Sequence, residues 1–231
     1  MPVIIHALNR GTDKRIIFLD DQDRLRFIHD LYEFNDQERK PSNYYFFAKS
    51  NDIEGRQITY QYNTRNPARK LLVDIHAFTL MPNHYHLLLS ERVKHGIARF
   101  MHKLDMGYSK YFNARYKRTG TLFEGRYKPI PVTKESHLIH LPYYIHCNPL
   151  DLSFPGWRGR ELVNHEAAVE SLKSYRWSSH LDYLGVKNFP SITSRKFLLE
   201  MFGGTKGYQQ AIRQWLRSMD LESTGKVRLE D

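Results

Sequence analysis

The sequence has very little of several features that define whole classes of protein. Its 231 residues include one cysteine, Cys147, which excludes an intrachain disulfide framework and a zinc site built from several cysteines. No stretch approaches the roughly 18 uninterrupted apolar residues of a membrane-spanning helix. The first residues, MPVIIHALNRGTDK, lack the basic start, long apolar core and small-residue cleavage site of a signal peptide. We therefore expect a cytoplasmic protein.

Acidic residues are scarce relative to basic ones. Lys and Arg total 35 against 25 Asp and Glu, which gives a formal net charge of +10. A basic chain of this kind suggests a polyanionic partner, most often nucleic acid, although a basic surface can also serve solubility alone. Hydrophobic residues make up 41% of the chain, which is ordinary globular usage and argues against wholesale disorder.

Hydrophobic periodicity predicts strands and helices that alternate along the chain. The expected strands are residues 3–5, 16–18, 44–47, 71–81, 84–89 and 127–132, with a further short strand at 58–60 inside a polar loop. The expected helices start near Asp20, at 94, at Thr133 or Ser136, at 194 and at 207. This order predicts an α+β fold with helices packed on one face of an antiparallel sheet. We divide the chain into a domain at 1–149, and a linker with a mostly helical C-terminal extension at 150–231.

The first candidate for chemistry is the pair His84 and His86 in the motif HYH. Alternate side chains of a strand point to the same face, so the two imidazoles project together. Two neutral imidazoles on a rigid strand form half of a divalent-metal site, but two ligands do not close one. Because the chain has 12 histidines, two structural or exposed histidines are the alternative interpretation.

The second candidate is Tyr144 with Asn148 in PYYIHCNP, four positions apart and so on one face of a helix. A tyrosine is a usable nucleophile only where a cation stabilises its phenolate, and an asparagine oxygen suits a hard cation such as Mg²⁺ or Mn²⁺. Alternatively, the tyrosine belongs to a helix core and Asn148 marks a helix exit. Tyr143 is the competing nucleophile, disfavoured because its interval to Asn148 does not place the two on one face.

The third candidate is a basic and aromatic tract at residues 110–128. It carries six basic residues against the single acid Glu124, with five aromatic residues between them. Basic side chains neutralise phosphates, and aromatic rings stack on unpaired bases. We expect the aromatics to be partly core. The expected DNA-binding residues are Lys110, Arg115, Lys117, Arg118, Arg126 and Lys128.

Four motifs in order, MPNHYHLLL, NARYKRTGTLFEGRYK, YYIHCNP and YRWSS, resemble the single-tyrosine HUH transposases of the insertion-sequence-200-like group. The resemblance is closest to the REP-associated tyrosine transposases and covers roughly residues 3–185. It implies a ferredoxin-like fold, with Mg²⁺ or Mn²⁺ held by His84 and His86 and completed by Asn148. It further implies that Tyr144 cuts single-stranded or hairpin DNA through a 5′-phosphotyrosine intermediate, in a monomer or a homodimer.

Pro142 stands two residues before Tyr144, where a proline inside a helix removes one hydrogen bond and clashes with the preceding turn. We expect either a kink or a new helix with Pro142 in its first turn. Two alternative functions stay open at this point. One is a catalytically silent protein that binds single-stranded or hairpin nucleic acid, and the other is a metal-dependent phosphodiesterase that activates water.

Overall fold

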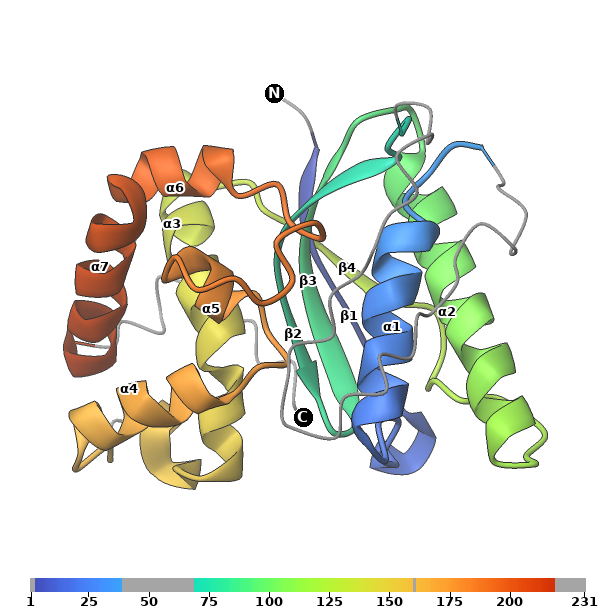
Figure 1. Ribbon diagram of the computed structural model, residues 1–231, viewed down its shortest axis with the longest axis horizontal. Helices are drawn as coiled ribbons and strands as arrows, with labels where there is room; N and C mark the ends of the chain where they lie inside the picture. Colours follow the sequence, from blue (N-terminus) through green and yellow to red (C-terminus); the bar gives the residue numbers. More distant parts are fainter. Residues whose placement is uncertain (1–2, 39–68, 160, 219–231) are drawn as a thin grey trace, which may run out of the picture.

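A computed structural model of the chain describes residues 3–38, 69–159 and 161–218. Its first half follows the order βαββαβ, and the strands form one antiparallel sheet in the order β2-β3-β1-β4 (Figure 1). This is the ferredoxin-like arrangement that the family resemblance implied. The elements are β1 Ile4–Arg10, α1 Asp21–Glu33, β2 Val73–Met81, β3 His84–Glu91, α2 Gly96–Arg115 and β4 Lys128–Pro131.

Strands β2 and β3 form a hairpin, joined by the turn at Pro82 and Asn83. Strand β2 lies at the edge of the sheet, and β3 and β1 occupy the middle. Residues 177–179 cover this edge: the amide of Leu80 donates to the carbonyl of Trp177, and the amide of Ser179 donates to the carbonyl of Phe78. Backbone groups that an edge strand would otherwise expose are thereby paired.

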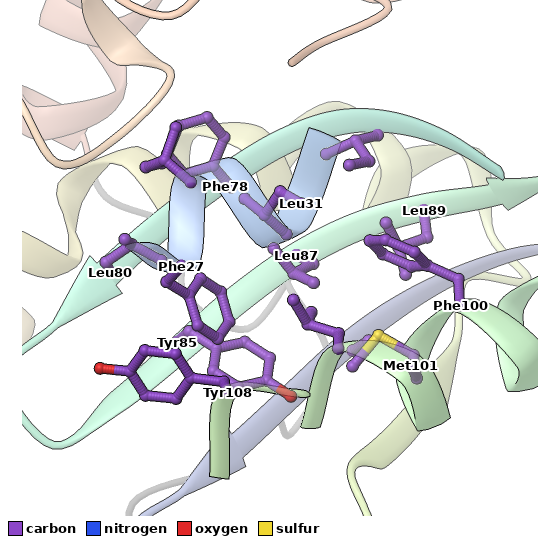
Figure 2. Packing of buried hydrophobic residues seen from close by; sticks show 14 of the residues in the cluster. Phe27, Leu31, Phe78, Leu80, Tyr85, Leu87, Leu89, Phe100, Met101 and Tyr108 are labelled. Atoms are coloured by element: carbon purple, nitrogen blue, oxygen red, sulfur yellow. The ribbon is translucent and has the colours of Figure 1, made fainter. Parts of the chain in front are cut away.

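Helices α1 and α2 cover one face of the sheet and enclose an aromatic core (Figure 2). The side chain of Asp20 accepts the amide of Asp23 and caps α1 at the predicted position. Tyr85, Leu87 and Leu89 of β3 all point into this core. Strand alternation therefore turns His84, His86 and Leu88 to the opposite face.

The opposite face is covered by α3 Glu135–Cys147, so helices lie on both sides of the sheet rather than on one (Figure 1). The C-terminal helices pack behind α3 in a second core that includes Leu88, Tyr143 and Trp215. The C-terminal residues 150–218 thus share a core with α3, and the division at residue 149 stays a prediction. These helices are α4 His165–Ser174, α5 His180–Tyr183, α6 Lys196–Phe202 and α7 Gly204–Ser218.

A buried hydrogen-bond chain ties α7 to α3. The hydroxyl of Tyr208 lies 2.7 Å from Nδ1 of His146 and 2.8 Å from Nδ1 of His180, and Nε2 of His146 lies 2.7 Å from Oγ of Ser179. All four side chains are at most 1% exposed. Leaving polar groups this deeply buried without a hydrogen bond would cost stability, so these hydrogen bonds fix the position of α7 against α3.

Several local expectations are corrected by the structure. Residues 16–18 form no strand. The loop expected after Asn148 includes two short 3₁₀ helices at Asn148–Leu152 and Pro155–Gly159. Pro142 lies inside the continuous α3, so no new helix begins there. The strands expected at 44–47 and 58–60 lie outside the described residues. Within the described ranges, no helix is long and apolar enough to cross a membrane.

Candidate functional site

The two histidines of the HYH motif meet on the face of β3 that α3 covers. Their ring centroids are 4.9 Å apart and the ring planes are perpendicular. In each ring Nδ1 has a hydrogen-bond partner, whereas Nε2 of His84 and Nε2 of His86 are buried without one. Two adjacent imidazole nitrogens without partners are what a bis-imidazole metal site requires.

The protonation of His84 is fixed by its neighbour Asn83. The amide nitrogen of Asn83 donates to the carbonyl oxygen of Lys14 at 3.2 Å, which orients the amide oxygen toward His84. Nδ1 of His84 lies 2.7 Å from that oxygen and must donate to it. The lone pair of His84 is therefore on Nε2, the nitrogen without a partner.

Burial keeps the imidazoles of the site neutral. It lowers the pKa of His84 to about 4 and that of His6 to about 3, and it holds the pKa of His86 well below its usual range. The neighbouring imidazoles and the guanidinium of Arg158 lower the pKa of His86 further. Because only a neutral imidazole has a lone pair to share, these histidines are ready for a cation at neutral pH.

Tyr143 and Tyr144 diverge from adjacent positions on α3. The ring of Tyr144 lies 5.9 Å from that of His86 and 6.2 Å from that of His6, measured between centroids. The ring of Tyr143 lies instead against α6 and α7, 6.0 Å from the ring of Tyr208. Of the two candidate nucleophiles, only Tyr144 therefore faces the histidines.

Asn148 is buried beneath Tyr144, and both ends of its amide are engaged. Its nitrogen donates to the carbonyl oxygen of Tyr144 at 2.7 Å, and its oxygen accepts from the guanidinium of Arg158 at 3.0 Å. Arg158 also stands 5.1 Å from the ring centroid of Tyr144 and makes two hydrogen bonds to Asp151, at 2.9 and 2.7 Å. The side chain of Asn148 also interacts with His86. Its oxygen is already hydrogen-bonded to the guanidinium of Arg158.

A cleft of about 680 Å³ opens beside the histidine pair. His84 and His86 line its floor, together with Asp151. Its walls carry an excess of basic groups over acids, which suits an anionic polymer. The basic residues are Arg10, Lys14, Arg126 and Lys128, and the further acid is Glu124, which pairs with Arg10 at 2.9 Å.

The six basic residues predicted to bind DNA are not gathered in one place. Arg126 and Lys128 are exposed and line the cleft. Arg115 instead makes ion pairs with Asp20 at 2.5 Å and with the buried Asp23 at 2.6 Å. Its charge is already neutralised, so a phosphate would compete with two carboxylates. Lys110, Lys117 and Arg118 do not line the cleft, and their role in DNA binding stays a prediction.

Sequence reasoning missed four residues that build the site: His6, Asn83, Asp151 and Arg158. Asn83 had a visible signal, because it directly precedes His84 in the hairpin turn. His6 is 80 positions from His86, and only the pairing of β1 with β3 brings them together. Arg158 lies in a stretch that was expected to be a loop, where no periodicity marks its direction.

His76 and Cys147 lie apart from the site. His76 is hydrogen-bonded to Oγ of Ser90 at 2.8 Å and to the carbonyl of Ser194 at 3.3 Å, on the far strand of the sheet. Cys147 is a buried free thiol whose pKa is raised by burial, so it is unreactive packing material.

Comparison with known proteins supports the resemblance drawn from the motifs. Residues 53–148 match the family described as IS200-like transposases, a range that includes the histidine pair, Tyr144 and Asn148. No curated protein matches the sequence. A solved structure of a REP-associated tyrosine transposase bound to a REP hairpin is similar at a TM-score of 0.45 and 12% identity, over 81% of this chain and 83% of that chain.

Proposed function

We propose that this chain, whose residues 53–148 match the IS200-like transposases, is a metal-dependent single-stranded DNA endonuclease and strand transferase. Tyr144 is the proposed nucleophile, and His84, His86 and Asn148 are the proposed metal ligands. Hairpin-flanked single strands are the proposed substrate.

One observation carries the proposal: Tyr144 stands beside two buried imidazoles whose Nε2 atoms have no partner, next to a cleft with basic walls. A buried nitrogen without a hydrogen bond is costly unless a ligand takes it up. A purely structural pair of histidines would be expected to use both nitrogens of each ring. A divalent cation therefore fits the donor set.

When bound, Mg²⁺ or Mn²⁺ supplies positive charge to the scissile phosphate and offsets the charge that grows in the transition state. His84 and His86 would hold it through Nε2. The oxygen of Asn148 is a suitable third ligand for a hard cation, and it becomes available once Arg158 releases it. Asp151 also lines the cleft, and its carboxylate acts electrostatically on His84.

The covalent step belongs to Tyr144. Its phenol oxygen attacks phosphorus in line, the bond from phosphorus to the 3′ oxygen breaks, and the phenol proton is transferred overall to the leaving 3′ hydroxyl. The product is a phosphodiester between Tyr144 and the 5′ end of the strand. The same step run backwards with another 3′ hydroxyl rejoins DNA, so neither cutting nor joining consumes ATP.

The cleft accounts for the proposed substrate class. Arg126 and Lys128 provide phosphate contacts along its wall, and a single strand can bend its sugar–phosphate backbone toward His84 in a way that a stacked duplex resists. Exposed basic side chains on α2 and just after it, such as Lys110 and Lys117, would extend the phosphate-binding surface beyond the cleft. The oligomeric state, monomer or homodimer, is part of the same proposal.

The test is incubation of a hairpin-flanked single strand, labelled at its 3′ end, with the protein and Mn²⁺. We expect a labelled covalent adduct that survives denaturation, disappears with a chelator and is absent from His84→Gln. Release of free 5′-phosphate without an adduct would favour a hydrolytic phosphodiesterase. Salt-sensitive binding of the hairpin without cleavage would favour a catalytically silent DNA-binding protein.

A further inference from the structure

We propose that His6 is a positioning residue: when a metal ion binds Nε2 of His86, His6 accepts the proton on Nδ1 of His86 and holds that ring in place. The inference rests on the proposed function, because it concerns the same metal site. His6 comes from β1 and does not belong to the motifs that carry the family resemblance.

The contact between the two rings is close and completely buried. Nε2 of His6 lies 2.9 Å from Nδ1 of His86, and the rings are stacked with centroids 5.0 Å apart. His6 is 0% and His86 is 1% exposed, so water does not compete for this bond. The pairing of β1 with β3 sets the distance, since Leu8 lies opposite His86 and His6 opposite Leu88.

The protons of His6 and His86 can be placed in two ways. A hydrogen bond between two neutral imidazoles needs one proton, which belongs to either ring. If His86 donates from Nδ1, its Nε2 has a lone pair. If His6 donates from Nε2, the proton of His86 is on its own Nε2, where it blocks coordination.

The two arrangements differ in where the second N–H lies. In the first, the unpaired N–H is on Nδ1 of His6, and in the second it is on Nε2 of His86; both atoms are buried without a hydrogen-bond partner among the described residues. The side chain of Asn148 interacts with His86 in the sense that favours a proton on this ring, whereas no interaction of this kind acts on Nδ1 of His6 within the described part of the chain, so the second arrangement is the better one without a metal. Coordination at Nε2 of His86 stabilises only the first, in which His6 is the acceptor.

The tautomers of His84 and His86 are thus set by different hydrogen-bond partners. The amide oxygen of Asn83 can only accept, so it fixes His84 as the Nδ1–H tautomer whether or not metal is present. His6 can both accept and donate, so the tautomer of His86 is decided by occupancy of the site. His6 does not touch the metal. It provides a hydrogen-bond acceptor at a fixed position for Nδ1 of His86.

The test combines two variants of His6 with two readouts that do not depend on cleavage. His6→Gln places an acceptor oxygen near the former Nε2, whereas His6→Leu removes the acceptor and keeps an apolar side chain. We expect His6→Leu to weaken Mn²⁺ binding by about tenfold or more, and His6→Gln to stay within about threefold of the wild type. Circular dichroism and thermal unfolding check that both variants are folded.

The second readout is the ¹⁵N spectrum of the imidazoles in the wild type, with Zn²⁺ as a diamagnetic probe. We expect His86 to shift to the pure Nδ1–H form on addition of metal, while His84 has that form throughout. His86 in the Nε2–H form with metal bound would overturn the inference, as would equal Mn²⁺ affinities for His6→Leu and the wild type. A loss in His6→Gln as large as in His6→Leu, in folded protein, would also overturn it.

These outcomes are separable from failure of the proposed function. If the wild type does not bind Mn²⁺, or if His84→Gln binds Mn²⁺ as well as the wild type, then the metal site itself is wrong. If the wild type binds metal and only the His6 variants behave otherwise than expected, then the proposed function stands and the role of His6 is wrong.

Discussion

The ring of Tyr144 stands nearly perpendicular to the ring of His86, at an interplanar angle of 84° with the centroids 5.9 Å apart. This contact brings an α3 side chain against a β3 side chain, 58 positions earlier in the chain. The proposed nucleophile and one proposed metal ligand are therefore neighbours in the folded protein, on a face of the sheet that also borders the cleft.

The adjacent tyrosines provide a matched pair for testing the nucleophile. Tyr144→Phe removes the attacking oxygen but keeps the ring contact with His86, so we expect hairpin binding to persist and the covalent adduct to disappear. Tyr143→Phe keeps Tyr144 intact, and we expect adduct formation within a few-fold of the wild type. An adduct formed by Tyr144→Phe would show that another residue attacks.

Arg158 competes with a metal for the oxygen of Asn148. Its hydrogen bond at 3.0 Å must break before that oxygen coordinates a cation, and its charge repels the cation. We expect Arg158→Ala to tighten Mn²⁺ binding by about tenfold, since a hydrogen bond from a charged group contributes about 1.5 kcal/mol. Isothermal titration measures this change. Weaker or unchanged binding would mean that Arg158 supports the site rather than competes for it.

Salt dependence of DNA binding separates the cleft cations from Arg115. Each phosphate contact adds nearly one to the slope of log affinity against log salt, so we expect Arg126→Ala and Lys128→Ala to reduce that slope by about one each. Arg115→Ala leaves the buried carboxylate of Asp23 without its cation. We expect this variant to keep the salt slope and to lower the melting temperature, and the reverse pattern would contradict the assignment.

Stability of the metal-free protein is expected to fall as the solution is acidified below pH 6.5. The unfolded chain protonates its histidines near that pH, whereas folded His84 does so at about pH 4 and His6 at about pH 3. The unfolded state thus binds more protons in this window, and each histidine contributes a slope of up to about 1.4 kcal/mol per pH unit. Urea unfolding between pH 7 and pH 5 measures the slope, and His84→Gln should reduce it.

The order of elements and the facing of the HYH motif could be predicted because they depend on local patterns. Alternation along residues 84–89 indicates which side chains share a face, and the four-residue interval from Tyr144 to Asn148 survives even with Pro142 inside the helix. The family match at 53–148 agrees with the resemblance that the motifs indicated.

The rest depends on contacts between distant segments, which periodicity does not report. Nothing near Arg158 indicates that it reaches Asn148, and nothing near His6 indicates that it pairs with His86. Arg115 was assigned to DNA from its charge, but charge alone does not distinguish a phosphate from the carboxylate of Asp23. Helices on the second face of the sheet were missed because the partners of α3 come from residues far downstream.

The hydroxyl of Tyr208 bonds His146, which lies between Tyr144 and Asn148 on the same turn of α3. During synthesis, α3 is made about sixty residues before Tyr208. The nascent chain therefore has every proposed metal ligand and the proposed nucleophile while their support is still missing. Cleavage competence would then arise only after α7 has been made and has packed against α3.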